Sequence, residues 1–475
     1  MTTQFDTASY LASRLETALS VASRSSAQIV AVTVPAPVVT PALVLGLRCD
    51  PVAYYFAAGD NGGDVGFGAA ITLDEENTGD LSALEVKGQA LLEQALELGI
   101  DAAAKAPRFY GGVAFDRSPA KAGPWGAFGH FSFVVPRFRY VTDGQRASVT
   151  LHVLTPEIAS SAEQRNWVHE LEQLVAGLAA VPAAGALPAV RRRSELPSAT
   201  RWLDQVRGAL VAMRDGLLEK VVLAREVIVE FDEAPSVSRI LENLNAFSPE
   251  TTRFALRRGK SIFLGATPER LILRSGSELR TEAVAGSIRA LDSDGAVQLM
   301  QSEKERHEHE LVVREVVRKL ELLGARVEVN RRPAVRQLRH VLHLASPITA
   351  RLFGPPHILT ILGRLHPTPA VGGVPEQEAR VFMRQAEDFE RGWYAAPIGW
   401  FDAQGDGEFV VGLRSGLLSE NLLRLYAGAG IVRASVPEQE FQETELKLQS
   451  MLEAIGSPES PRASVCPNLP HLTVP

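Results

Sequence analysis

The chain has 475 residues, long enough to bury a large core, and its 45% hydrophobic and 22% charged content is ordinary for a globular protein. Its net charge of −7 gives no support for nucleic-acid binding, and no uncharged apolar stretch is long enough to span a bilayer. The two cysteines, Cys49 and Cys466, stand in no C-x-x-C pattern, and the first residues lack the basic and apolar segments of a signal peptide. We therefore expect a cytoplasmic protein that binds neither membranes nor nucleic acid.

The first 190 residues mix helical and strand patterns without regular alternation. Leucines at four-residue spacing predict a helix over residues 8–22, and amphipathic patterns predict further helices over 81–99 and 162–179. A stretch rich in Pro, Ala and Arg, residues 181–197, is the best candidate for a boundary or a surface crossover. Runs of β-branched and aromatic residues predict strands over residues 28–34, 52–58, 131–137 and 147–153.

Residues 198–456 carry the clearest periodic patterns. Ser198 or Thr200 can cap a helix, and a strand over 220–230 follows it. The tail, residues 457–475, is rich in Pro and Ser, and we expect it to be disordered. Further helices are predicted over residues 296–323, 376–390 and 438–455, and further strands over 254–256, 261–264, 270–273, 325–330, 409–413 and 422–427.

Strands and helices do not follow a strict βαβ alternation in either part of the chain. This irregular order favours an α+β fold, in which helices pack on the outside of large antiparallel sheets. Residues 1–190 would form the N-terminal part of that fold.

Two segments of the C-terminal half carry acidic residues three positions apart, Glu305 with Glu308 and Glu440 with Glu443. On a helix this spacing puts both carboxylates of a pair on one face. Two facing helices of this kind would form an oxygen-rich clamp for a hard divalent cation, of which Mg²⁺ fits best; the alternative is a pair of solvated helix faces. Zinc is disfavoured because the two histidines of the first segment are two residues apart and point in different directions.

Seven further segments are informative in their order along the chain: Glu219–Arg225, Gly265–Leu271, Gly286–Arg289, His366–Ala370, Pro397–Trp400, Leu413–Ser415 and Ala427–Ile431. Together with the acidic helices they resemble the chorismate-utilising enzymes, which include isochorismate synthases, salicylate synthases and the large subunits of anthranilate and aminodeoxychorismate synthases. The resemblance covers residues 198–456, which would then be the catalytic region. It implies a two-sheet core with outer helices and an active site in a central cleft.

Two residues of these segments are candidates for acid–base chemistry. Lys220 begins an apolar strand, where desolvation can make a lysine a general base; the alternative is a strand-end lysine with its ammonium in solvent. In isochorismate and salicylate synthases the matching lysine is held to activate water for attack on C2 of chorismate. Glu269 follows the rigid Pro268, and the resemblance implies that it is the general acid that protonates the departing C4 hydroxyl. Its alternative is a turn-capping or salt-bridged glutamate.

The resemblance also implies a metal and its ligands. Mg²⁺ would be bound directly by Glu308 and Glu443 and through water by Glu305 and Glu440, next to the ring carboxylate of chorismate.

Substrate-binding positions follow from the same resemblance. Arg414 could bind the enolpyruvyl carboxylate bidentately, and Gly428 and Gly430 would let backbone N–H groups approach an anion. Lys447 would share the metal-facing side of the last helix, and His366 would line the cleft near the leaving hydroxyl. The remaining expected substrate positions are Ser287 and Ala370.

Three positions distinguish the branches of the family. Lys220 argues against anthranilate synthases, which carry glutamine there. Ala285 stands where aminodeoxychorismate synthases carry lysine, and Ala370 where the amine-adding enzymes tend to carry threonine. Neither cysteine sits in a Gly-flanked nucleophile turn, so no glutamine amidotransferase subunit is expected and water is the expected nucleophile.

The expected activity is therefore that of an isochorismate synthase, a Mg²⁺-dependent isomerase. The nearest alternative is a salicylate synthase, which eliminates pyruvate from the same intermediate and more often carries threonine where this chain has Ser287. A non-catalytic, chorismate-binding family member is the third alternative. The product could feed menaquinone or siderophore biosynthesis, with menaquinone preferred.

Overall fold

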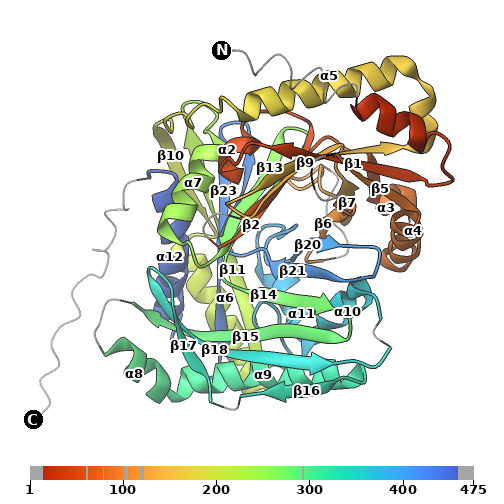
Figure 1. Ribbon diagram of the computed structural model, residues 1–475. Helices are drawn as coiled ribbons and strands as arrows, with labels where there is room; N and C mark the ends of the chain where they lie inside the picture. Colours follow the sequence, from red (N-terminus) through yellow and green to blue (C-terminus); the bar gives the residue numbers. More distant parts are fainter. Residues whose placement is uncertain are drawn as a thin grey trace, which may run out of the picture.

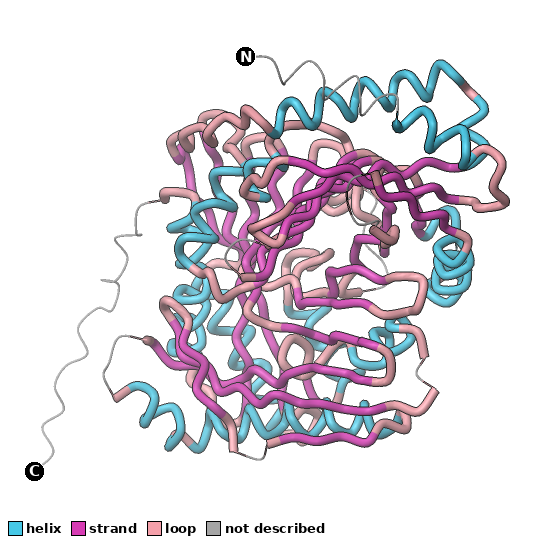
Figure 2. Tube along the Cα trace, in the orientation of Figure 1, coloured by secondary structure: helices cyan, strands magenta, loops and turns pink. Residues whose placement is uncertain are grey.

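The computed structural model describes residues 14–59, 62–78, 80–100, 102, 105–116, 122–290, 294–330, 332–354 and 356–457. Two large β-sheets form the centre of the molecule, and most helices lie on their outer faces (Figures 1 and 2). The predicted α+β class with large sheets and outer helices is confirmed. Among the described residues, no helix has the length and apolar character needed to cross a bilayer.

The first sheet joins strands from both halves of the chain. Its middle pairing sets residues 252–258 against residues 52–58, with Phe254 opposite Phe56. Among its described strands only the pairing of β1 with β5 is parallel. Their order is β10 (Val190–Leu196), β11 (Lys220–Phe231), β23 (Leu422–Val432), β22 (Ser415–Ser419), β13 (Ser261–Thr267), β12 (Thr252–Arg258), β2 (Val52–Ala58), β3 (Gly63–Phe67), β8 (Phe138–Thr142), β9 (Ala147–Leu154), β1 (Ile29–Ala36) and β5 (Ala95–Gly99), with β19 (Gly373–Val374) beside β11.

The second sheet is antiparallel throughout its described strands. Its two longest strands pair with each other, and a bulge at Gly286 interrupts their register between Ala285 and Ser287. Gly286 has a φ of 77°, and a Cβ there would lie 2.8 Å from the carbonyl oxygen of Glu305, so only glycine fits. The order is β16 (Arg326–Val329), β18 (Val341–Arg351), β15 (Glu278–Arg289), β14 (Arg270–Ser275), β21 (Gly407–Val411), β20 (Pro397–Phe401), β6 (Phe109–Val113), β7 (Phe131–Val135) and β4 (Ile71–Asp74), with β17 (Ala334–Gln337) beside β18.

The helices cover the sheets from outside (Figure 1). Helix α9 packs on β15 and β18, while α12 packs on β23, α6 and α7. The two acidic segments therefore lie on helices that belong to different sheets. The bounds are α2 (Pro41–Leu45), α3 (Glu75–Thr78), α4 (Leu81–Glu93), α5 (Ser161–Leu178), α6 (Ala199–Arg214), α7 (Val237–Phe247), α8 (Gly295–Gln301), α9 (Glu303–Leu322), α10 (Ile358–Leu365), α11 (Glu376–Ala386) and α12 (Pro437–Ala454), with a 3₁₀ turn at Thr155–Ala159 and helical residues at 14–22.

Among the described residues, most buried apolar side chains belong to two large clusters, and a small third cluster joins α8 to β18. The larger cluster includes the space between the sheets, where Tyr54 of β2 stacks on Tyr110 of β6 at 3.9 Å. The other large cluster lies between the first sheet and its helices and includes Leu171 of α5, Leu241 of α7 and Leu448 of α12. Burial of such side chains is worth about 25 cal/mol per Å² of apolar surface, so both faces of the first sheet contribute to stability.

The predicted boundary at residues 181–197 is part of the first sheet. Its second half forms β10, which pairs with β11, so Leu196 stands opposite Glu226. Strands from residues 1–190 and from 198–456 lie side by side in both sheets. The N-terminal part is thus built into the same body as the C-terminal part.

Three predicted helices have the wrong bounds, and one of them, predicted over residues 376–390, ends at Ala386. The pattern over residues 296–323 is broken at Ser302, which has an extended ψ of 115° and whose hydroxyl accepts a hydrogen bond from the N–H of Glu305. This cap starts α9 just before its acidic pair. The pattern over 81–99 ends as a helix at Glu93, because residues 95–99 pair with β1 and complete the sheet edge.

Several local signals are confirmed. Ser198 caps α6 by accepting from the N–H of Arg201, and residues 220–231 form the predicted strand β11. The last helix ends at Ala454, before Gly456. The first thirteen residues and the tail from residue 458 lie outside the described residues, so the predicted disorder of the tail stays a prediction.

Candidate active site

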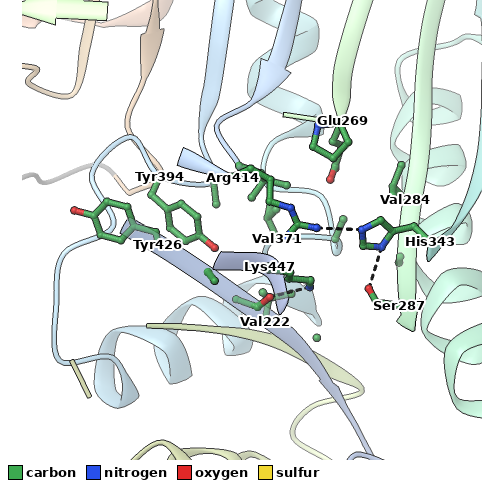
Figure 3. A pocket seen from close by; sticks show the side chains of 18 of the residues that line it. Val222, Glu269, Val284, Ser287, His343, Val371, Tyr394, Arg414, Tyr426 and Lys447 are labelled. Atoms are coloured by element: carbon green, nitrogen blue, oxygen red, sulfur yellow. Dashed lines mark hydrogen bonds between the residues drawn. The ribbon is translucent and has the colours of Figure 1, made fainter. Parts of the chain in front are cut away.

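A cavity lies at the junction of the two sheets (Figure 3). Strands β11 and β23 of the first sheet, β15 and β18 of the second, and helices α9 and α12 all contribute side chains to it. Its lining residues are Val222, Pro268, Glu269, Val284, Ala285, Gly286, Ser287, Glu308, His343, Ala370, Val371, Arg391, Tyr394, Ala395, Leu413, Arg414, Tyr426, Ala427, Gly428, Gly430 and Lys447.

Two connections that cross from one sheet to the other hold Glu269 and Arg414. Glu269 lies between β13 and β14, and Arg414 lies between β21 and β22. The crossings are hydrogen-bonded to each other: Val411 N–H donates to the Glu269 carbonyl at 3.1 Å, and Ala266 N–H donates to the Arg414 carbonyl at 3.1 Å. Sheet-to-sheet geometry therefore fixes the backbone of both residues, and Arg414 is held at a positive φ of 48°.

Glu269 has the properties of a proton donor at neutral pH. Its side chain is buried, and Figure 3 shows it pointing into the cavity on the side away from Lys447. Burial and the nearby Glu282 carboxylate raise its pKa to about 8, against the opposing charges of Lys220, Arg336 and Lys447. A carboxylic acid with such a pKa keeps its proton at pH 7, which supports the predicted acid role and argues against a salt-bridged glutamate.

Lys220 is fully buried and forms an ion pair with Glu308. Its Nζ lies 2.9 Å from Glu308 Oε1. The alternative of a solvated strand-end lysine is wrong. Lys220 does not itself line the cavity; the Glu308 carboxylate and Gly430 stand in the wall beside it. A Cβ at Gly430 would collide with Glu308 Oε1 and lie 3.1 Å from Lys220 Cε, so a larger residue would displace this ion pair.

Arg414, His343 and Ser287 form a hydrogen-bonded chain in the cavity wall (Figure 3). Arg414 Nη2 donates to His343 Nε2 at 3.2 Å, and His343 Nδ1 lies 2.9 Å from Ser287 Oγ. Because a guanidinium only donates, Nε2 must accept and Nδ1 carries the proton that is donated to Ser287. Burial and the Arg414 charge hold the pKa of His343 well below its usual range, which keeps this neutral tautomer. Burial also lowers the pKa of Arg414 to about 10.

Lys447 joins α12 to the strand that carries the two glycines. Its Nζ donates to the Gly428 carbonyl at 2.9 Å and lies 2.6 Å from Glu443 Oε1. Gly428 and Gly430 line the same wall of the cavity. The structure thus brings together eight of the predicted positions: Glu269, Ser287, Glu308, Ala370, Arg414, Gly428, Gly430 and Lys447.

The four predicted metal ligands are held by lysines. Glu308 pairs with Lys220 and Glu443 with Lys447, while Lys304 bridges Glu305 and Glu440. Glu305 Oε2 also accepts from the N–H of Ser287 at 2.8 Å. Among the described residues, no three His, Cys, Asp or Glu side chains converge on one metal position.

The chemistry of this donor set nevertheless fits a hard cation. Burial and the Glu443 charge raise the pKa of Glu440 to about 7, and burial and the Glu308 charge raise the pKa of Glu305. Burial also acts to raise the pKa of Glu443, but the charges of Lys447 and Lys304 outweigh it and the pKa is lowered. Four carboxylates stand against three ammonium groups, and an added dianionic substrate would increase the excess of negative charge. Oxygen-only donors with excess negative charge are what Mg²⁺ prefers.

His366 lies close to the site with its ring nitrogens buried but is not part of the cavity wall. It is absent from the cavity lining; its ring packs edge-on against Phe115 at 5.5 Å, and it ends α10. Burial, with the charges of Arg380 and Lys319, holds the pKa of His366 well below its usual range. The expected place of His366 near the leaving hydroxyl stays a prediction, and His343 is the histidine that lines this cavity.

Sequence reasoning missed His343, Arg391 and two tyrosines. Arg391 is buried and donates to the carbonyls of Val222 and Val371, and so it braces two parts of the wall. Tyr394 stacks on Tyr426, with ring centroids 5.1 Å apart. A signal for Arg391 and Tyr394 was present, since both lie just before the Pro397–Trp400 segment.

Comparisons with known proteins identify the family of the chain. The sequence profile of the family described as "Chorismate binding enzyme" matches residues 14–456. The salicylate biosynthesis isochorismate synthase of Pseudomonas aeruginosa is 36% identical over 82% of both chains, and isochorismate synthase MenF of Bacillus subtilis is 32% identical over 74% of this chain and 75% of its own. The solved structure of the menaquinone-specific isochorismate synthase MenF from Escherichia coli superposes with a TM-score of 0.75 at 28% identity and covers 93% of this chain and 99% of its own.

Proposed function

Since the chain belongs to the chorismate-binding enzyme family, we propose that it is an isochorismate synthase, an isomerase that converts chorismate to isochorismate. The observations that support this activity best are a buried acid in the cavity wall and a buried lysine directly behind that wall. Glu269 has a pKa of about 8, and Lys220 lies behind the wall formed by Glu308. The reaction needs both a proton donor and a proton acceptor.

Each residue then has a defined part in the reaction. With its amine in the uncharged form, Lys220 Nζ accepts a proton from the water that attacks C2, and the ring double bond shifts. Glu269 delivers its proton to the C4 oxygen as the C–O bond breaks, because hydroxide alone is a poor leaving group. Arg414 binds a substrate carboxylate, and its orientation is set by His343. Lys447 holds the glycine wall in place through the Gly428 carbonyl.

We place Mg²⁺ at the acidic cluster, bound by Glu308 and Glu443 directly and by Glu305 and Glu440 through water, where it would supply positive charge for the ring carboxylate of chorismate.

Product identity tests the proposal. Purified protein incubated with chorismate and Mg²⁺ should give isochorismate, with little salicylate and no anthranilate even when ammonium is supplied. Products separated by chromatography at early times decide the matter. Early, dominant salicylate with pyruvate would assign salicylate synthase instead, and no turnover would favour a non-catalytic chorismate-binding protein.

Metal dependence is a second expected result. EDTA should abolish turnover and Mg²⁺ should restore it, while Zn²⁺ should substitute poorly because the donors are all carboxylates. Glu308→Gln and Glu443→Gln should each weaken Mg²⁺ binding, measured by calorimetry, with folding verified by circular dichroism. Full activity in a metal-free preparation would contradict the assignment.

A further inference from the structure

Lys304 occupies the middle of the acidic cluster. Its Nζ lies 2.8 Å from Glu440 Oε1 on α12 and 3.1 Å from Glu305 Oε1 on its own helix. Lys304 is the only cation within 4 Å of Glu440 among the described residues, and the Glu440 side chain is fully buried. This ammonium group therefore ties the helix of one sheet to the helix of the other.

An open groove leads from solvent to this contact. It meets the main cavity at Ser287, which lines both. Four carboxylates and two cationic side chains face it, so the groove favours small cations over anions. Its lining residues are Ser287, Ile288, Arg289, Ser302, Lys304, Glu305, Val341, Glu438, Gln439, Glu440, Gln442, Glu443 and Leu446.

Lys304 and a hydrated divalent cation need the same oxygen atoms. A Mg²⁺ ion bound by Glu308 and Glu443 keeps several waters, and those waters must donate to nearby carboxylates. Glu305 and Glu440 are the acceptors within the cluster, and Lys304 already takes one oxygen of each. An ammonium group and a doubly charged ion at this spacing also repel each other strongly in a partly buried site.

We propose that Lys304 is a built-in counter-ion that competes with the divalent cation and must leave Glu305 and Glu440 when the metal binds. This inference rests on the proposed Mg²⁺ site. It assigns Lys304 two effects: it stabilises the contact between α9 and α12 without metal, and it weakens the affinity for metal.

The test replaces Lys304 with glutamine and measures Mg²⁺ binding by calorimetry together with the Tm in EDTA and in saturating Mg²⁺. Lys304→Gln should bind Mg²⁺ at least about tenfold more tightly than the parent, because the competing charge is gone. Its Tm should fall in EDTA, where buried carboxylates lose their partner, and should return to the parent value in Mg²⁺.

Arg289→Gln is the matched control, because Arg289 lines the same groove but makes no ion pair with the cluster among the described residues. It should change Mg²⁺ affinity far less. An equal increase in Mg²⁺ affinity in both variants would show that any lost positive charge in the groove has this effect, and it would overturn the proposal. A Lys304→Gln protein with parental affinity and an equal loss of Tm with and without Mg²⁺ would show an ordinary salt bridge, which also overturns it. Absence of Mg²⁺ binding in the parent would instead refute the metal site itself.

Discussion

Glu269→Gln should lower kcat by roughly 10² to 10⁴, the usual contribution of a positioned proton donor, with a smaller change in KM. Glutamine keeps the shape of the side chain and leaves the backbone hydrogen bonds around residue 269 intact. Its amide is not acidic, however, so it cannot protonate the leaving hydroxyl. Arg414 and the glycine wall are unchanged, so substrate binding should survive. Steady-state kinetics with chorismate over a range of Mg²⁺ concentrations measure both parameters.

The pH profile gives a second readout on Glu269. With a pKa of about 8, the acid is protonated at pH 7, and kcat should fall as the pH rises through about 8. Glu282→Gln removes the negative charge that helps to raise this pKa, so the alkaline limb should move to lower pH. An unchanged limb in Glu282→Gln, or near-normal kcat in Glu269→Gln, would leave Glu269 as a structural residue only.

Stability should depend on pH in a linked way. The folded-state pKa of Glu269 is raised to about 8 above an unfolded value of about 4.3, so the folded chain holds a proton that the unfolded chain has released between these pH values. The free energy of unfolding therefore falls as the pH rises from about 4 to about 8. Glu269→Gln removes this penalty and should be more stable than the parent near pH 8, as urea unfolding at several pH values would show.

Lys220→Met should have the other large effect, with losses in both activity and stability. Methionine fills much of the same volume but cannot accept a proton, so kcat should fall by roughly 10² or more. It also leaves the Glu308 carboxylate without its partner at a buried position, which typically costs about 3–5 kcal/mol of unfolding free energy. Kinetics and urea unfolding, both with and without Mg²⁺, measure the two losses separately.

A double-mutant cycle distinguishes the ion pair from general damage. Glu308→Gln in the Lys220→Met background should restore part of the lost stability, because no unpaired charge remains, but it should not restore kcat. Lys260→Met is the control: Lys260 is exposed and pairs with the exposed Glu420, so neither kcat nor stability should change. Additive effects of the Lys220 and Glu308 substitutions on the free energy of unfolding would contradict the ion pair. A normal kcat in Lys220→Met would show that Lys220 is not the base.

Local patterns in the sequence predicted the elements that carry the site. The spacing of apolar residues indicated β11 and α12, and the cap at Ser198 located the start of α6. The local patterns were less reliable where two structural signals overlapped in the same segment. The helical pattern over residues 296–323 was continuous, so it did not indicate that Ser302 caps a new helix. Residues 95–99 were predicted to be helical, but they pair with β1 at the edge of the first sheet. Pairing with a distant strand overrides propensity over so short a segment.

By itself, the sequence determined which residue types carry the chemistry, because ordered segments and carboxylate spacing are local properties of the chain. Only the tertiary structure decided what each group faces. It buried Glu269 beside Glu282, which makes it an acid, and it set Lys220 against Glu308 rather than against solvent. It also put His343, and not His366, in the cavity, since Arg414 meets His343 across 71 residues of chain. Burial and such long-range contacts set pKa values and partners, and no short window of sequence contains them.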